Sequence, residues 1–193
     1  MSNEYESLKM IYAELWKTAV VSDNKSDEVA MLINTYILPN RERYKKVEGL
    51  TSVPWHVVAV IHGRESSYSF QKHLHNGDPL TARTRNVPSN RPETGTPPFT
   101  WETSAVDALM IKKFHLIKVW PVERICYSLE KYNGFGYRLY HQDVQSPYLW
   151  SYTNQYSKGK YVGDRDFDPE TVDKQAGCMA IYKTLVGLGQ VTL

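Results

Sequence analysis

The sequence predicts a single domain with an α-rich α+β fold, and two observations lead to this prediction. Apolar residues recur at helical spacing over much of the chain, whereas residues 71–98 contain five prolines and show no helical period. With 193 residues the chain is long enough to bury a core of its own. We therefore expect packed helices interrupted by a stretch of turns that includes a short hairpin.

Two helices are predicted within residues 1–50. From Tyr5 to Val21, apolar residues recur every three or four positions. Ser26 is suited to cap a second helix, whose apolar positions continue to Tyr36. Both segments have the pattern of packing helices.

A third helix is expected to begin at Thr51 or Ser52, with Pro54 in its first turn, and to run toward Glu65. Residues 55–61 are apolar nearly all round, which is typical of a helix buried on every side.

Further helices are predicted after the turn-rich stretch. Thr100 is expected to cap one, Pro121 to open another, and Asp168 with Pro169 to start the last. Residues 132–168, before that last helix, are rich in Gly, Tyr, Ser and Asn. Because no repeat, linker or domain boundary is visible, we expect one domain over all 193 residues.

Composition narrows the classes of function. Lysine plus arginine total 23 against 21 for aspartate plus glutamate, a balance that argues against a nucleic-acid partner. No apolar run approaches the roughly 20 residues of a membrane span, and the start MSNEYESLKM lacks the features of a secretory signal. Cys126 and Cys178 are expected to be buried, reduced thiols. The 14 tyrosines and 5 tryptophans suit flat, amphipathic ligands such as sugars.

Glu65 is the strongest candidate for a reacting group. In the segment AVIHGRESSYSF it lies where the apolar helix ends and a serine-rich loop begins. Partial withdrawal of a carboxyl group from water disfavours its charged form, which is the tuning that a general acid needs near neutral pH. The alternatives are an ion pair with the adjacent Arg64 and a side chain that faces solvent.

The segment HGRESSYSF resembles the helix end that carries the catalytic glutamate in the lysozyme-like superfamily of peptidoglycan hydrolases, as in lytic transglycosylases and goose-type lysozymes. The segment HNGDPLTARTRNVP, residues 75–88, resembles the short hairpin that follows that glutamate. The resemblance implies a lysozyme-like fold, with a helical core, a small β-hairpin lobe after Glu65, and the glycan in the cleft between them.

Asp78 and Thr84 match a second part of the same resemblance. Phage-type lysozymes carry an aspartate in this hairpin and a threonine six residues later, both of which contact the water or the sugar at the cleavage point, and Asp78 and Thr84 have that spacing. The connection from Glu65 to Asp78 is longer than in those enzymes, and Thr81 competes with Thr84 for the role. An aspartate before Pro79 is also typical of an ordinary turn.

Residues 132–164 contain Tyr-Asn-Gly and Ser-Pro-Tyr-x-Trp-Ser, and they resemble a segment of many cyanobacterial and phage lysozyme-like proteins. The resemblance implies that Tyr132 and Asn133 line the sugar cleft opposite the glutamate. Further aromatic residues of this segment are candidates for stacking on sugar rings, with core packing as the alternative: Tyr137, Tyr148, Trp150 and Tyr152.

His73, His75 and Asp78 raise the possibility of a zinc peptidase that cuts cell-wall peptides. Neither an HExxH motif nor a second spaced histidine pair accompanies them. We therefore predict no metal and no cofactor, and we expect these histidines to form hydrogen bonds at a polar rim.

Together these features predict a glycoside hydrolase that cuts the glycan strands of peptidoglycan, a lysozyme or N-acetylmuramidase. Glu65 would protonate the leaving oxygen, while Asp78, helped by Thr84 or Thr81, would orient a water or stabilise positive charge on the sugar. The alternatives are a lytic transglycosylase, a chitinase- or chitosanase-like glycosidase, and a non-catalytic glycan-binding module.

The expected setting follows from the same features. We expect a monomer whose partner is the peptidoglycan glycan strand, with no nucleic-acid partner and no membrane span. Synthesis in the cytoplasm without a signal peptide fits an endolysin, which acts on the cell wall after its release, or an effector delivered by another machine.

Overall fold

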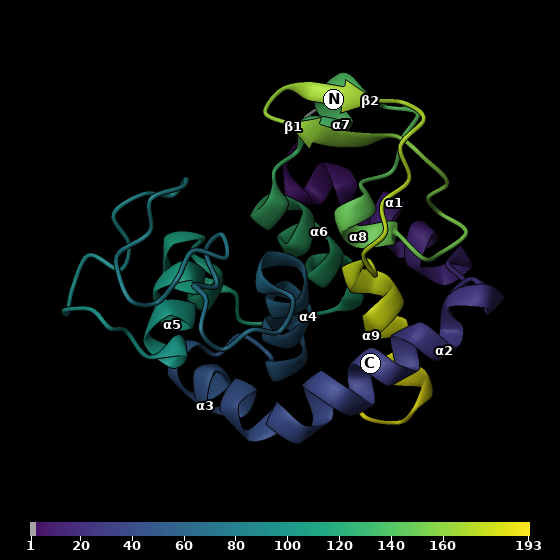
Figure 1. Ribbon diagram of the computed structural model, residues 1–193. Coiled ribbons are helices and arrows are strands. Elements are labelled where there is room, and N and C mark those ends of the chain that lie inside the picture. Colours follow the sequence, from purple (N-terminus) through teal and green to yellow (C-terminus); the bar gives the residue numbers. More distant parts are fainter. Residues whose placement is uncertain (1–2) are drawn as a thin grey trace. The chain divides into compact units, whose positions relative to one another are not determined.

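The computed structural model describes residues 3–193, which group into two compact units. Unit 1 comprises residues 3–33 and 120–193, and unit 2 comprises residues 34–119. The described chain is predominantly helical and has one two-stranded antiparallel sheet, which confirms the α-rich α+β prediction (Figure 1).

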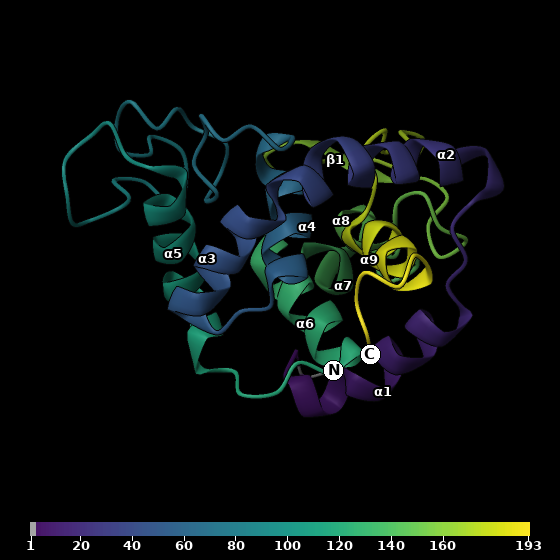
Figure 2. The same ribbon diagram turned by 90° about the horizontal axis from the view of Figure 1, so that it is seen from below.

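Unit 1 is built mainly from helices. Their bounds are α1 (Tyr5–Thr18), α2 (Asp23–Leu32), α6 (Val122–Asn133), α7 (Gly136–Tyr140), α8 (Pro147–Trp150) and α9 (Cys178–Gly187). Helix α1 packs along α6, while α9 contacts both α2 and α8 (Figure 2). The buried face of α6 includes Ile125 and Leu129, and α1 contributes Leu8 and Tyr12 to the core.

The sheet of unit 1 consists of β1 (Lys160–Gly163) and β2 (Asp166–Asp168). Tyr161 lies opposite Phe167, and their rings meet edge to face with centroids 5.4 Å apart. The sheet lies beside α7, where the Tyr161 ring packs against Gly136 (Figure 1).

Unit 2 is centred on a buried helix. Its elements are η2 (Leu38–Asn40), α3 (Arg41–Thr51), α4 (Trp55–Ser66), α5 (Trp101–Ile111) and η3 (Phe114–Leu116), and the π-helical turn η1 (Ile33–Ile37) leads into it. Helix α3 packs against both α4 and α5 (Figure 1). Every residue of α4 from Val57 to Gly63 is buried, as its apolar sequence predicted.

Several predicted helices are confirmed with their boundaries nearly as expected. They are α1, α5 and α6, while α4 is confirmed as a buried helix that begins later than expected, at Trp55. Thr100 caps α5, because its hydroxyl accepts a hydrogen bond from the backbone N–H of Thr103 at 3.2 Å. Pro121 precedes the first residue of α6, where its missing N–H costs no helical hydrogen bond.

The prediction for residues 26–51 is wrong in two respects. Helix α2 begins at Asp23, so Ser26 lies inside it, where its hydroxyl donates to the Asp23 carbonyl. Thr51 does not start the buried helix. It is the last residue of α3, a helix that was not predicted from the sequence. Only a narrow stripe of α3 is buried. Its buried residues Tyr44 and Val47 lie among charged neighbours in the sequence, so the recurrence of apolar residues at helical spacing is weak.

The hairpin expected within residues 75–88 does not form a pair of strands. An isolated bridge joins Lys72 to Pro79, and the backbone N–H of His73 donates to the Asp78 carbonyl at 2.7 Å. Because Pro79 has no N–H to donate, the ladder does not extend from that residue. The strand pair lies instead at residues 160–168, in the other unit.

The last helix begins ten residues later than predicted, at Cys178 instead of Asp168. The Asp168 carboxylate accepts hydrogen bonds from the backbone N–H groups of Glu170 and Thr171, which makes a turn at the end of β2. The N-cap of α9 is Gly177, where an added Cβ would come within 2.4 Å of the Leu149 carbonyl oxygen. The predicted Asp-Pro signal therefore belongs to a turn.

Two further predictions concern the two cysteines and membrane-spanning helices. Cys126 and Cys178 are buried thiols, as expected. Over residues 3–193, no helix combines the length and the apolar character needed to cross a membrane.

Candidate active site at the end of helix α4

Glu65 is the penultimate residue of α4 and is half-buried. The chain reverses directly after it, because Ser67 and Tyr68 adopt left-handed conformations with φ of 51° and 61°. Tyr68 then lies over Gly63, where an added Cβ would be only 2.6 Å from the tyrosine ring. The fold-back therefore requires a glycine one half-turn before Glu65.

The loop that follows returns to the backbone of Glu65. Gly77 has φ of 78°, and a Cβ added there would meet the Glu65 carbonyl oxygen at 2.6 Å. A glycine is therefore needed twice over, for its conformation and for the close approach. Since Asp78 is the next residue, the structure brings the backbones of the two predicted catalytic carboxylates close together.

The carboxylate of Asp78 is engaged by its own loop. Its Oδ2 accepts hydrogen bonds from the backbone N–H groups of Arg85 and Asn86 at 2.7 and 2.9 Å, and its Oδ1 accepts one from Asn86 Nδ2 at 2.7 Å. Burial raises the pKa of this carboxyl, but these donors outweigh burial and hold the pKa below its ordinary value. Asp78 is therefore ionised near neutral pH and anchors the segment that contains Arg85 and Asn86.

The two candidate threonines differ in their surroundings. Thr84 is 3% exposed, and its hydroxyl donates to the Pro88 carbonyl at 2.5 Å and accepts from the Arg91 N–H at 2.9 Å. Thr81 is exposed. The Thr84 hydroxyl is therefore engaged in holding a turn, and Thr81 is the more accessible of the two.

The histidines that suggested zinc are bonded to the protein. His73 pairs through Nδ1 with the Ser104 hydroxyl and through Nε2 with the Ala82 carbonyl, both at 2.8 Å. His75 pairs through Nδ1 with Ser104 at 3.3 Å and through Nε2 with Asp107 at 2.8 Å. Within the described part of the chain, no group of three or more His, Cys, Asp or Glu side chains is arranged to hold a metal ion.

The hydrogen bonds around His73 and His75 include a Ser-His-Asp arrangement that was not predicted from the sequence. Ser104, His75 and Asp107 are connected in the order found in serine hydrolases. Ser104, however, is fully buried, and its oxygen also accepts from the Leu74 N–H at 3.2 Å. Arg91 donates to both oxygens of Asp107 at 3.0 and 2.6 Å. A buried, multiply bonded serine is not placed to attack a substrate, so we interpret the network as structural.

A third buried histidine lies one turn before Glu65 on α4. His62 is fully buried, and its Nδ1 is 2.9 Å from the Tyr44 hydroxyl. Its ring centroid is 4.6 Å from the rings of both Phe70 and Trp101. Burial lowers the pKa of His62 to about 4, so the ring is neutral at neutral pH and helps to fix the end of α4.

The sugar-binding residues predicted from the resemblance belong to unit 1. Tyr132 is 6% exposed at the end of α6, and the neighbouring Asn133 is exposed. Tyr137 is also 6% exposed, and its hydroxyl accepts a hydrogen bond from the Tyr161 N–H at 3.2 Å, which ties α7 to β1.

Tyr148 and Trp150 were candidates for stacking on sugar rings, with packing in the core as the alternative. Tyr148 is 5% exposed and Trp150 is fully buried. Tyr152 is 8% exposed, and its hydroxyl contacts Glu28 and the Lys174 carbonyl. Rings buried in this way have no face to offer a sugar, so packing in the core of unit 1 explains them better.

The described structure thus brings Glu65, Asp78, Thr81 and Thr84 into one unit. Comparisons with protein-family models, with curated proteins and with solved structures found no match to this chain.

Proposed function

We propose that this protein cleaves the glycan strands of peptidoglycan, with Glu65 as the general acid. One observation carries the proposal: Glu65 is half-buried at the end of a buried helix, and the chain folds back so that Gly77 touches its backbone and Asp78 follows. Such an arrangement supports a lysozyme-like site, in which a positioned acid faces a polar loop.

The chemistry assigned to each residue follows from its surroundings. Glu65 is half-buried in the last turn of α4, and the loop that contains Asp78 returns to its backbone. Glu65 would give a proton to the glycosidic oxygen as the bond breaks. The ionised carboxylate of Asp78 would stabilise positive charge on the sugar or orient a water, with Thr81 as a further contact.

A zymogram with purified peptidoglycan, run beside one with chitin, tests the substrate class. The proposal expects a zone of clearing in peptidoglycan. Clearing in chitin alone would replace it with a chitinase-like activity, and retention on peptidoglycan without clearing would replace it with a glycan-binding module.

A lytic transglycosylase is the second candidate, and the hydrogen bonds of Asp78 favour it. A carboxylate that accepts three hydrogen bonds from its own loop is a weak base for activating water. In that mechanism the muramyl 6-hydroxyl attacks instead of water, and Glu65 keeps its role.

Mass spectrometry of digested wall separates the two mechanisms. A hydrolase releases reducing muropeptides and loses about a hundredfold or more of its rate in Asp78→Asn. A lytic transglycosylase releases 1,6-anhydromuramyl products and remains active in that variant.

The setting of the activity is part of the proposal. A monomer of this kind would act on the wall after release from the cytoplasm or delivery by another machine, as an endolysin does.

A further inference from the structure

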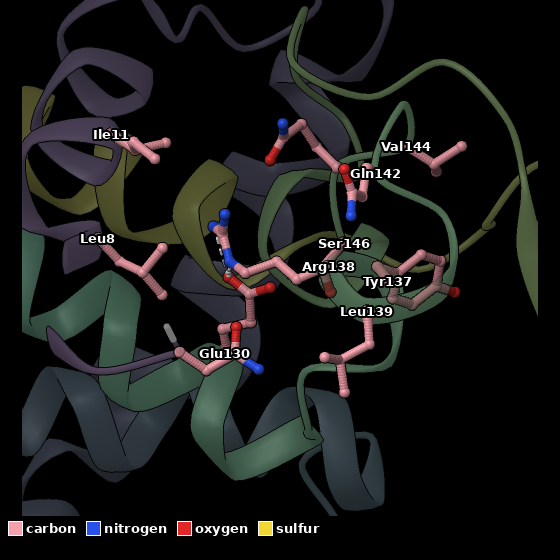
Figure 3. A pocket seen from close by; sticks show the side chains of 11 residues that line it. Leu8, Ile11, Glu130, Tyr137, Arg138, Leu139, Gln142, Val144 and Ser146 are labelled. Carbon is pink, nitrogen blue, oxygen red and sulfur yellow. Dashed lines mark hydrogen bonds and ion pairs between the residues drawn. The ribbon is translucent and has the colours of Figure 1, made fainter. Parts of the chain in front are cut away.

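Unit 1 contains a cavity of about 290 Å³ that the Glu65 proposal does not use. It is bounded by α1, the end of α6, and residues 137–146. Figure 3 shows Leu8 and Ile11 of α1 on one side of it and Gln142 and Val144 of the loop after α7 on the other. All of the described lining residues belong to unit 1, so the cavity is a property of that unit alone.

The carboxylate of Glu130, which forms an ion pair with Arg138, lies on the wall of this cavity. Glu130 is 2% exposed, and its Oε2 accepts a hydrogen bond from the Tyr12 hydroxyl at 2.5 Å. The same oxygen accepts hydrogen bonds from Arg138 Nε and Nη2 at 3.1 and 2.9 Å (Figure 3). Within residues 3–193, all three of these hydrogen bonds go to Oε2, and none of them occupies the second oxygen, Oε1, which is an acceptor for a ligand. Because Arg138 already balances the negative charge of Glu130, the ligand does not need to be a cation.

Ser146 supplies a polar group that the protein itself does not satisfy. It lines the cavity and is 3% exposed, and its Oγ has no hydrogen-bond partner within the described chain. Ser146 occupies the N-cap position of α8, where serine usually accepts a hydrogen bond from the helix, yet its side chain makes no such bond. A buried hydroxyl without a partner is costly, so a ligand or a water that bonds to it would be stabilising.

The remaining lining indicates the chemistry of that ligand. Gln145 is half-buried beside Ser146, and its carboxamide offers a donor and an acceptor. Leu8, Ile11 and Val144 supply an apolar surface. The volume lies near the lower end of ligand pockets, which measure about 300–1,000 Å³, so a single small molecule fits better than an oligomer.

We propose that this cavity binds one neutral, hydroxyl-rich molecule of about monosaccharide size. Its hydroxyl groups would bond to Ser146 Oγ, the Gln145 carboxamide and Glu130 Oε1, and its C–H face would lie on Leu8 and Ile11. The site goes beyond the proposed cleavage activity and does not depend on the role of Glu65.

Titration followed by NMR tests the site in the full-length chain that carries Glu65→Gln, so that cleavage does not interfere. The probes are N-acetylglucosamine, glucose and myo-inositol, with 1,5-diaminopentane and inorganic phosphate as charged comparisons. We expect saturable shifts of the Gln145 side-chain amide and the Ser146 backbone amide with at least one neutral probe. Ser146→Ala should weaken that affinity about tenfold, the effect of one lost hydrogen bond.

Ser128→Ala is the matched control. Ser128 of α6 is also fully buried with an Oγ that lacks a partner among the described residues, but it does not line the cavity. This variant should bind the neutral probe as the parent does. Both alanine variants should unfold at or above the parent's midpoint temperature, because each removes a buried, unsatisfied hydroxyl.

Three results would overturn the proposal. The first is that none of the neutral probes saturates the site, which would mean that the cavity holds only water. The second is that Ser146→Ala binds the neutral probe with the same affinity as the parent. The third is that the diamine or phosphate binds more tightly than the neutral probes. Since the experiment uses an inactive background and reads residues of unit 1, its failure would leave the proposed function of Glu65 untouched.

Discussion

The loop after α4 and the loop after α7 are both polar and irregular, but they use their polar side chains differently. In the first loop Asp78 and Thr84 are bonded to backbone groups of the loop itself. In the second, Ser146 lies buried at a cavity with no partner for its hydroxyl among the described residues. A polar residue of the first kind shapes a site, and one of the second kind is available to a ligand.

This difference explains why residue type and spacing alone do not assign a role. The spacing of Asp78 and Thr84 matched a catalytic pattern, yet the hydrogen bonds of both side chains hold turns. Ser146 is the first residue of the Ser-Pro-Tyr-x-Trp-Ser segment, but no role was predicted for it, and its hydroxyl has no partner within the described residues. If hydrogen-bond engagement separates the two kinds of residue, substitutions that remove engaged groups should destabilise the protein, whereas removal of the Ser146 hydroxyl should not.

The largest effect on stability is expected from Arg138→Met. This variant removes the cation that balances the buried Glu130 carboxylate, and an uncompensated buried charge costs about 3–5 kcal/mol. Chemical denaturation measures the free energy of unfolding. The matched control is Lys158→Met, which breaks an exposed pair with Glu170 and should cost about 0–1 kcal/mol. An equal loss of unfolding free energy in the two variants would mean that the Glu130–Arg138 pair does not stabilise the fold.

The buried His62 predicts acid sensitivity near the end of α4. Its pKa falls from 6.5 to about 4 on folding because burial disfavours the charged ring. The resulting stability is fully present above about pH 6.5 and is lost as the pH falls toward 4, by up to about 3 kcal/mol. An NMR titration of the His62 ring, recorded with unfolding free energies over the same range, checks this. A ring that titrates near pH 6.5 in the folded protein would contradict the structure.

Thr84 and Thr81 form a matched pair for the loop after α4. Thr84→Val leaves the Pro88 carbonyl and the Arg91 N–H without their partner, which should cost about 1–3 kcal/mol. Thr81→Val changes an exposed side chain and should stay within about 0.5 kcal/mol. Thermal unfolding of both variants makes the comparison. If Thr84→Val is as stable as Thr81→Val, the loop does not depend on the hydroxyl of Thr84.

No effect is expected from metal removal. The ring nitrogens of His73 and His75 have protein partners, so a chelator should leave wall lysis unchanged. Lysis assays with and without EDTA measure this. Loss of activity in EDTA with recovery on addition of zinc would support a metallopeptidase instead.

Much of the helical fold was predictable from local sequence. The apolar run of α4 and the Thr100 cap of α5 each have a short-range physical cause, and both appear in the structure as expected. Helix α3 was not predictable in this way, because its buried stripe is narrow and its helical state depends on packing against α4 and α5.

The site was predictable only in part. The place of Glu65 at a helix end follows from the change of pattern along the chain. The contact of Gly77 with the Glu65 backbone, and the hydrogen bonds that occupy Asp78, depend on how the later loop folds back. Whether Trp150 stacks on a sugar or packs in the core was left open for a related reason, since a polar neighbourhood in sequence does not reveal what packs around a ring in three dimensions.

The most direct test of the central claim compares wall lysis by Glu65→Gln and Glu102→Gln. Glutamine has nearly the same shape as glutamate but cannot transfer a proton. Glu102 is the matched control, because it is a glutamate of the same unit, with a side chain 15% exposed, and it pairs with Arg43. We predict that Glu65→Gln loses lysis by about a hundredfold or more while its unfolding midpoint stays near the parent's. Glu102→Gln should lyse wall within a few-fold of the parent. Lysis by a folded Glu65→Gln at the rate of Glu102→Gln would contradict the assignment of Glu65 as the acid.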